Sequence, residues 1–79
     1  MTTNIDFPVY RKYTDNSSYF RILSEEEFEE KKKMPSGYAL FKFKAKILPD
    51  RNYIHDMLYE YQLHWKVIDA SEYESVQAE

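Results

Sequence analysis

The residues of this sequence whose types could do chemistry are two histidines with a neighbouring acid, and a run of glutamates. His55 and His64 are nine residues apart, and Asp56 directly follows the first. A metal site would need a third ligand and a spacing such as i, i+4 on a helix, which neither histidine has. We therefore expect no metal site here and a structural role for both histidines.

The glutamates are concentrated between Glu25 and Glu30, with Phe28 among them. Such a cluster could serve as an acid/base pair or hold a divalent ion. A catalytic carboxylate, however, needs apolar surroundings that shift its pKa, and only Phe28 supplies apolar surface here. We interpret these acids as the solvated first turns of a helix.

Two residue counts exclude further classes of site. The chain contains no cysteine, which excludes thiolate metal sites, disulfides and cysteine nucleophiles. Its single glycine, Gly37, excludes a glycine-rich phosphate loop. We therefore expect no enzyme activity and no cofactor; a small enzyme with a pocket near His55, His64 or Asp56 is the least favoured alternative.

The length of 79 residues allows one small domain, and an aromatic content of 18% is suited to filling its core. Residues 1–6 are expected to form a flexible N-terminus, and residues 77–79 a frayed end. The first ten residues lack the pattern of a secretory signal, and no apolar stretch is long enough to cross a bilayer. These features predict a cytoplasmic protein without a membrane segment.

Two segments, residues 19–30 and 64–75, show the same succession of residue types. In each, a short apolar run ends at a good helix N-cap, Ser24 or Asp69, and a glutamate, Glu27 or Glu72, follows three residues later. This spacing is that of a capping box, in which each side chain bonds the other residue's N–H. We predict that both segments are strands that turn directly into helices, and we interpret the similarity as convergence rather than duplication.

The other elements follow from apolar spacing and turn residues. Residues 7–13 and 19–23 flank a cluster of turn formers and predict a β-hairpin. A helix capped by Asp50 is expected to carry an apolar stripe made of Ile54, Met57, Leu58 and Tyr61. The predicted fold is a small α+β domain of order β-β-α-β-α-β-α, with a mainly antiparallel sheet of about four strands and its helices packed on one face.

The strand predicted over residues 40–47 alternates strictly between apolar residues and lysines. Phe41, Phe43, Ala45 and Ile47 would point to one side, and successive side chains of a strand point to opposite faces. If the helices cover the aromatic side, a basic face remains on the other. We name its members as the candidate binding residues: Arg21, Lys42, Lys44, Lys46 and Lys66, with Tyr19 and Tyr38 beside them.

Lysines on an exposed strand also protect a sheet edge against unwanted pairing, and this explanation stays open. The functional hypothesis is a small non-catalytic interaction or adaptor protein. Its basic face would meet an acidic protein surface or a second copy of the chain, so a homodimer is a further expectation. The alternative is weak binding of single-stranded nucleic acid through the lysines and the two tyrosines, against which stand the net charge of −3 and the pI of 5.4.

Overall fold

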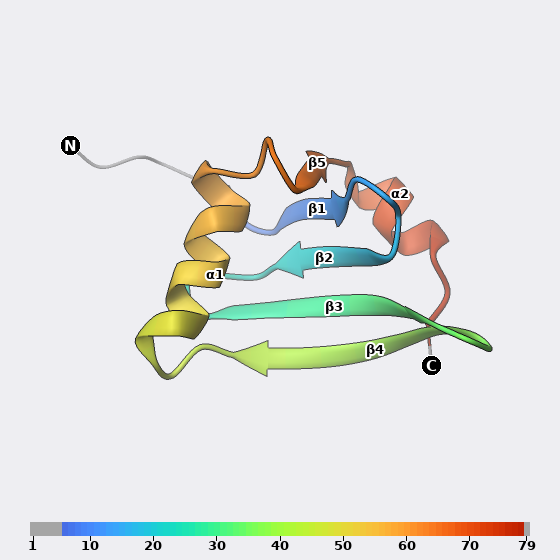
Figure 1. The fold of residues 1–79 in the computed structure, drawn as a ribbon, viewed down its shortest axis with the longest axis horizontal. Helices are drawn as coiled ribbons and strands as arrows, with labels where there is room; N and C mark the ends of the chain where they lie inside the picture. The colour runs from blue at the N-terminus through green and yellow to red at the C-terminus, as the bar shows by residue number, and fades with distance from the viewer. Residues whose placement is uncertain (1–5, 79) are drawn as a thin grey trace.

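The computed structural model describes residues 6–78 and shows one antiparallel sheet with two helices (Figure 1). The α+β class is confirmed. Five strands lie side by side in the order β4-β3-β2-β1-β5. In chain order the elements are β1 (Val9–Tyr13), β2 (Ser18–Ile22), β3 (Glu27–Met34), β4 (Gly37–Lys44), α1 (Leu48–Tyr59), β5 (Trp65–Val67) and α2 (Ala70–Ser75).

The first hairpin confirms the predicted pairing of residues 7–13 with residues 19–23. β1 and β2 are antiparallel, with Val9 opposite Ile22 and Lys12 opposite Tyr19. In the turn, Asn16 has a positive φ of 63°, a conformation that asparagine adopts more readily than most residues. The Asp15 carboxylate accepts a hydrogen bond of 3.0 Å from the Ser17 N–H and so closes the turn.

The helix predicted after Ser24 is wrong, because this segment forms strand β3. The Ser24 hydroxyl accepts a bond from the N–H of Glu26, two residues on, and the N–H of Leu23 donates to the Glu27 carbonyl at 2.9 Å. These bonds make a tight turn into β3 instead of a helix cap. The order is therefore β-β-β-β-α-β-α, with five strands where about four were expected.

The physical reason is that the segment has partners on both sides. As a helix, residues 24–34 would have presented little more than Phe28 and Met34 to the core. As a strand, β3 pairs with β2 on one side and β4 on the other, and Phe28 is buried to 6% exposure. Pairing along two ladders outweighs the local preference for a capped helix.

The second capping segment confirms its prediction. Asp69 is the N-cap of α2, and its carboxylate accepts a 2.8 Å bond from the Glu72 N–H. Two segments of similar residue types thus adopt different structures. The first is followed by a chain that pairs into the sheet, whereas the second packs as a helix over it.

The larger core lies between one face of the sheet and α1. Ile54, Met57 and Leu58 of the predicted stripe are buried, whereas Tyr61 lies beyond the end of the helix and is only partly buried. The helix begins at Leu48 with Pro49 in its first turn, not at an Asp50 cap, and Ile47 provides no capping side chain. The sheet residues of this core are Phe20, Ile22, Phe28, Ala45 and Trp65.

A second, smaller core lies on the opposite face, so the prediction that both helices share one face is wrong. Tyr19 and Phe20 are neighbours in β2 and point to opposite faces. Phe20 belongs to the core under α1, whereas Tyr19 packs with Ile68 and Tyr73 of the α2 region. Because β2 buries side chains on both faces, each face requires its own helix.

The buried Arg11 joins the two sides of the larger core. Its Nε donates to the Met57 carbonyl at 2.9 Å and its Nη1 to the Tyr10 carbonyl at 2.9 Å, while the guanidinium lies 4.3 Å from the centroid of the Tyr61 ring. The Met57 carbonyl belongs to the last turn of α1, where helix carbonyls lack intrahelical partners and a positive charge is favourable. Burial lowers the pKa of Arg11.

The described chain ends beside the second hairpin. Ala78 forms an isolated parallel bridge with Tyr38. Residues 1–5 of the expected flexible N-terminus, and residue 79, lie outside the described residues. In residues 6–78, neither helix has the length and hydropathy that a bilayer span requires.

Arg11→Ala is expected to lower the free energy of unfolding by about 2 to 3 kcal/mol, because it removes a charged hydrogen-bond donor and packed aliphatic surface. Urea unfolding followed by the fluorescence of the single tryptophan, Trp65, measures this. Arg51→Ala is the matched control. Arg51 pairs with Glu26 on the exposed surface, so its loss should cost less than about 0.5 kcal/mol. Equal losses in the two variants would contradict the assignment of Arg11 as a buried tie.

Candidate functional site

The strand register places most of the predicted basic face on one side of the sheet. Arg21 lies opposite Glu29, and Glu29 lies opposite Lys42, so these side chains share a face. Lys66 lies opposite Lys12 on the same face, at the far side of the sheet. Tyr19, Tyr38 and Lys44 share this parity as well, whereas Lys46 lies beyond the end of β4.

Helix α2 covers the middle of this face and neutralises it. Lys12 Nζ forms a 2.7 Å ion pair with Glu72. Lys31 Nζ donates 2.8 Å hydrogen bonds to the carbonyls of Tyr73 and Val76, and lies 4.0 Å from the centroid of the Tyr73 ring. The basic centre of the sheet is thus occupied by the acidic C-terminal part of the same chain.

Arg21 and the two tyrosines of the predicted site are therefore not openly available. Arg21 pairs with Glu29 at 3.1 Å beneath the Tyr73 ring. Tyr19 is 9% exposed and meets the half-buried Tyr38 edge to face. A nucleic acid would need open ring faces for its bases to stack on, and this pair does not offer them.

Several of the exposed basic residues lie on or just after β4, the outer strand of the sheet (Figure 1), while Lys66 of the predicted face is exposed on β5 at the other edge. Lys42, Lys44 and Lys46 are exposed. Within residues 6–78 the ion pairs are Lys12–Glu72, Arg21–Glu29 and Arg51–Glu26, so none of these three lysines is paired there. Glu29, which faces Lys42 across the ladder, is already bonded to Arg21.

The other side of β4 is aromatic and only partly covered. Phe41 and Phe43 were expected inside the core but are 40% and 43% exposed, because α1 crosses only one end of that face. Phe43 stacks on Phe28 with ring centroids 4.9 Å apart. Ala45 is buried as expected, whereas Ile47 is 60% exposed because it belongs to the turn into α1. Beside Phe43, between the sheet and α1, lies a hollow of about 280 Å³ that is also lined by Tyr53.

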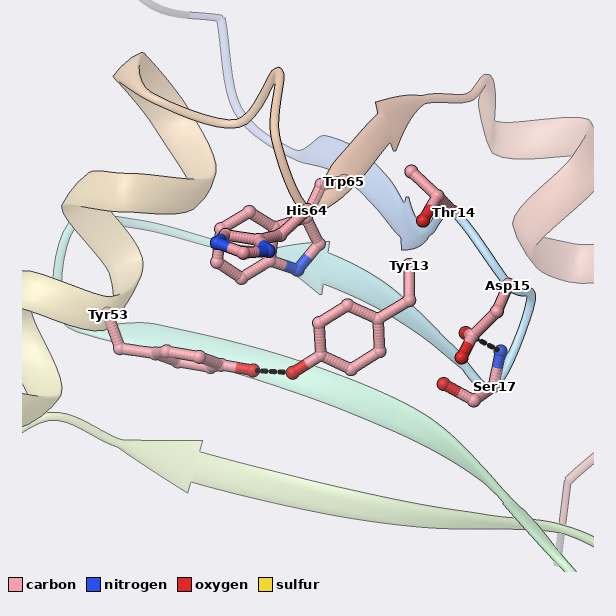
Figure 2. A pocket seen from close by; sticks show the side chains of 7 residues that line it. All are labelled: Tyr13, Thr14, Asp15, Ser17, Tyr53, His64 and Trp65. Atoms are coloured by element: carbon pink, nitrogen blue, oxygen red, sulfur yellow. Dashed lines mark hydrogen bonds between the residues drawn. The ribbon is translucent and has the colours of Figure 1, made fainter.

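A second hollow of about 450 Å³ lies on the α1 side of the sheet (Figure 2). The hydroxyls of Tyr13 and Tyr53 form a 2.6 Å hydrogen bond on its floor, and the Tyr13 ring stacks on Trp65. Burial, together with the Tyr13 hydroxyl, raises the pKa of Tyr53. Hydrogen bonds from Ser17 lower the pKa of Asp15 at the rim.

Within residues 6–78, the titratable residues of this hollow are not in direct hydrogen-bond contact with one another, apart from the two tyrosines. His64 is exposed and lies against Trp65, and Figure 2 shows Asp15 on the other side of Tyr13 from His64. In the described chain no hydrogen bond joins His64 to a carboxylate or hydroxyl. General acid–base or nucleophilic catalysis needs such a contact, directly or through a water molecule.

In the structure, Glu60 joins His55 and Asp56 as a third potential metal ligand. The donor atoms of His55 and Asp56 of α1 and of Glu60, the C-cap of this helix, lie within 4.8 Å of one another. The sequence analysis missed Glu60, which the i, i+4 spacing from Asp56 could have revealed. All three residues belong to the C-terminal part of α1 and its C-cap, and no other described element adds a ligand, so the cluster is not assigned as a metal site.

No protein-family model, curated protein or solved structure matches this chain. The function is therefore argued from the site alone. We use the name "β4 edge" for the exposed residues Phe41, Lys42, Phe43, Lys44 and Lys46. It is the region where unpaired positive charge and exposed aromatic surface coincide.

The α2 contacts predict an alkaline loss of stability. Burial and the neighbouring Glu29 carboxylate raise the pKa of Tyr73, so the folded protein keeps a proton that the unfolded chain releases above about pH 10. The free energy of unfolding should therefore fall as pH rises above 10, by at most about 1.4 kcal/mol per pH unit for this residue.

Tyr73→Phe, which cannot ionise, should reduce this fall, and Tyr59→Phe on the exposed side of α1 should not. Urea midpoints measured between pH 9 and pH 11.5 provide the comparison. Indistinguishable pH slopes in Tyr73→Phe and the wild type would show that this hydroxyl does not titrate as its buried position implies.

Proposed function

We propose that this protein is a non-catalytic interaction module whose β4 edge meets an acidic segment of another protein. The observation that carries the proposal is that lysines outside any ion pair of the described chain and exposed aromatic rings lie on the same strand. Lys12, Arg21 and Lys31 are engaged by α2 and Glu29. Lys42 and Lys44 form no ion pair within residues 6–78, although Glu29 and Glu27 lie opposite them on β3.

Protection of a sheet edge by lysine does not account for the whole β4 edge. A strand that only had to avoid pairing would gain nothing from exposing two phenylalanines on its other face. Phe41 and Phe43 are both at least 40% exposed, and Phe43 lines a hollow together with Phe28, Tyr53 and charged residues such as Glu30 and Asp50. Adjacent charge and aromatic surface are typical of a recognition site, where one supplies orientation and the other buried area.

A second copy of the chain suits this edge less well than an acidic partner. Two β4 strands paired about a two-fold axis would bring the lysines of both copies to the same face of the seam, opposite or diagonal to each other. Like charges in these positions destabilise strand pairing. The acidic helix α2 is also already engaged within its own chain through Glu72.

The net charge of −3 does not prevent this contact. Charges farther away than about 8 Å are largely screened at physiological ionic strength, so the local lysines dominate close to the strand. Lys66 lies on β5, at the opposite edge of the sheet, and is not part of the proposed site. The proposed binding site therefore comprises the residues of the β4 edge and not the whole basic face.

The test uses a fluorescent acidic peptide in which glutamate and valine alternate, Glu-Val-Glu-Val-Val between Gly-Ser flanks. Lys42→Glu together with Lys44→Glu should weaken its binding. Losing two ion pairs and creating two repulsions should lower affinity about tenfold or more in fluorescence anisotropy. The free energy of unfolding should change by less than about 0.5 kcal/mol, because both lysines are exposed.

The control is Lys32→Glu together with Lys33→Glu, which makes the same change in net charge on exposed residues of β3. This variant should keep its affinity within about threefold, because screening limits the reach of charges outside the site. Absence of binding by the wild type, or an equal loss in both variants, would overturn the proposal.

A further inference from the structure

The direction of the main-chain groups along β4 follows from the bonds at its end. In an antiparallel pair, successive residues turn their N–H and C=O groups alternately toward and away from the partner strand. The Ala45 N–H donates to the Glu26 carbonyl, and this pair continues the β3–β4 register. The main-chain N–H and C=O groups of Phe43 and Phe41 therefore bond to β3. Those of Lys42 and Lys44 point away from the sheet.

The bonds on the other side of β3 lead to the same assignment. The Leu23 N–H donates to the Glu27 carbonyl, and the Lys33 N–H donates to the Ser17 carbonyl. Odd-numbered residues of β3 thus bond to β2, which leaves even-numbered residues such as Phe28 to bond to β4. Phe28 lies opposite Phe43, so these bonds also require the main-chain N–H and C=O groups of Phe43 to point toward β3.

The outward-directed residues of β4 are Tyr38, Leu40, Lys42 and Lys44. Tyr38 is already matched by Ala78 in an isolated bridge, so the chain's own tail lies along one end of this edge. No described strand lies beyond Leu40, Lys42 or Lys44. The open part of the edge therefore runs from Leu40 to Lys44, and it already accommodates extended chain at its end.

We infer that the partner of the β4 edge binds as an added antiparallel strand in which acidic and apolar residues alternate, an inference that rests on the proposed function. Partner residues opposite Lys42 and Lys44 would form hydrogen-bonded pairs with Cα atoms about 5.5 Å apart, on the lysine face. Acidic side chains at these two positions neutralise the lysines.

The partner residues between and after these acids lie on the aromatic face. They would be opposite Phe43 and Phe41, in non-hydrogen-bonded pairs whose Cα atoms are about 4.5 Å apart, where apolar pairs pack best. The hollow beside Phe43 leaves room for a branched or aromatic side chain. Leu40, which is 37% exposed, shares the face of Lys42 and Lys44, and a residue opposite it would also be apolar. The recognised pattern is acid, apolar, acid, apolar, apolar, read from the residue opposite Lys44.

N-methylation of the Glu-Val-Glu-Val-Val peptide tests this geometry without changing its charge. The N–H groups of the two glutamates should point at Lys42 and Lys44, so methylating both should lower the affinity at least tenfold. The N–H groups of the first two valines should point away from β4, so methylating those two should change the affinity less than threefold. A shuffled Glu-Glu-Val-Val-Val peptide should also bind at least tenfold more weakly.

Amide hydrogen exchange of the wild-type protein supplies an independent measurement. In the free protein the Phe41 and Phe43 amides should be protected and those of Leu40, Lys42 and Lys44 should exchange rapidly. Peptide binding should slow exchange at the latter three. If the two methylation patterns had equal effects and no amide gained protection, strand addition would be wrong. The proposed function would still stand if the lysine substitutions weakened binding. No binding of the parent peptide would overturn both.

Discussion

The structure depends on the two-sided burial of β2. Its neighbouring residues Tyr19 and Phe20 point to opposite faces and are both buried, so neither face of the sheet can be left to solvent at its centre. Helix α1 covers one face through Ile54, Met57 and Leu58, and α2 covers the other through Tyr73. A chain of this length has no third helix in its described part, so the coverage stops short of the outer strand.

This incomplete coverage determines where charge stays available. The α2 face is basic, and besides the apolar contacts of Tyr73 the helix and its C-cap make polar contacts with it, with Lys12 bonded to Glu72 and Lys31 to the carbonyls of Tyr73 and Val76. The positive residues near the centre are thereby used in folding. Those of β4 are not, and the same strand keeps its aromatic side partly exposed because α1 crosses only one end of the sheet.

Local patterns predicted much of the fold. The turn residues after Tyr13, the helical spacing of Ile54, Met57 and Leu58, and the Asp69 cap all depend on neighbouring residues, and each prediction is confirmed. The helix predicted after Ser24 is wrong, although the capping pattern there is as good as the one at Asp69. The local pattern alone therefore does not distinguish a strand from a helix. Only the strands on either side of β3, which lie outside the capping pattern itself, decide between the alternatives. The spacing of the two histidines does not indicate the Glu60 ligand atom near His55, because it depends on the i, i+4 spacing of Asp56 and Glu60.

The sequence by itself determined that lysine and phenylalanine occupy opposite sides of the strand over residues 40–44, because side-chain direction in a strand alternates with every residue. It also determined the absence of thiol and glycine-loop chemistry, through composition. Only the tertiary structure decided that this strand is the sheet edge and that α2 conceals Arg21 and Tyr19. Strand order and helix docking are set by contacts between residues far apart in the chain. The alternation of side chains along a single strand carries no information about those contacts.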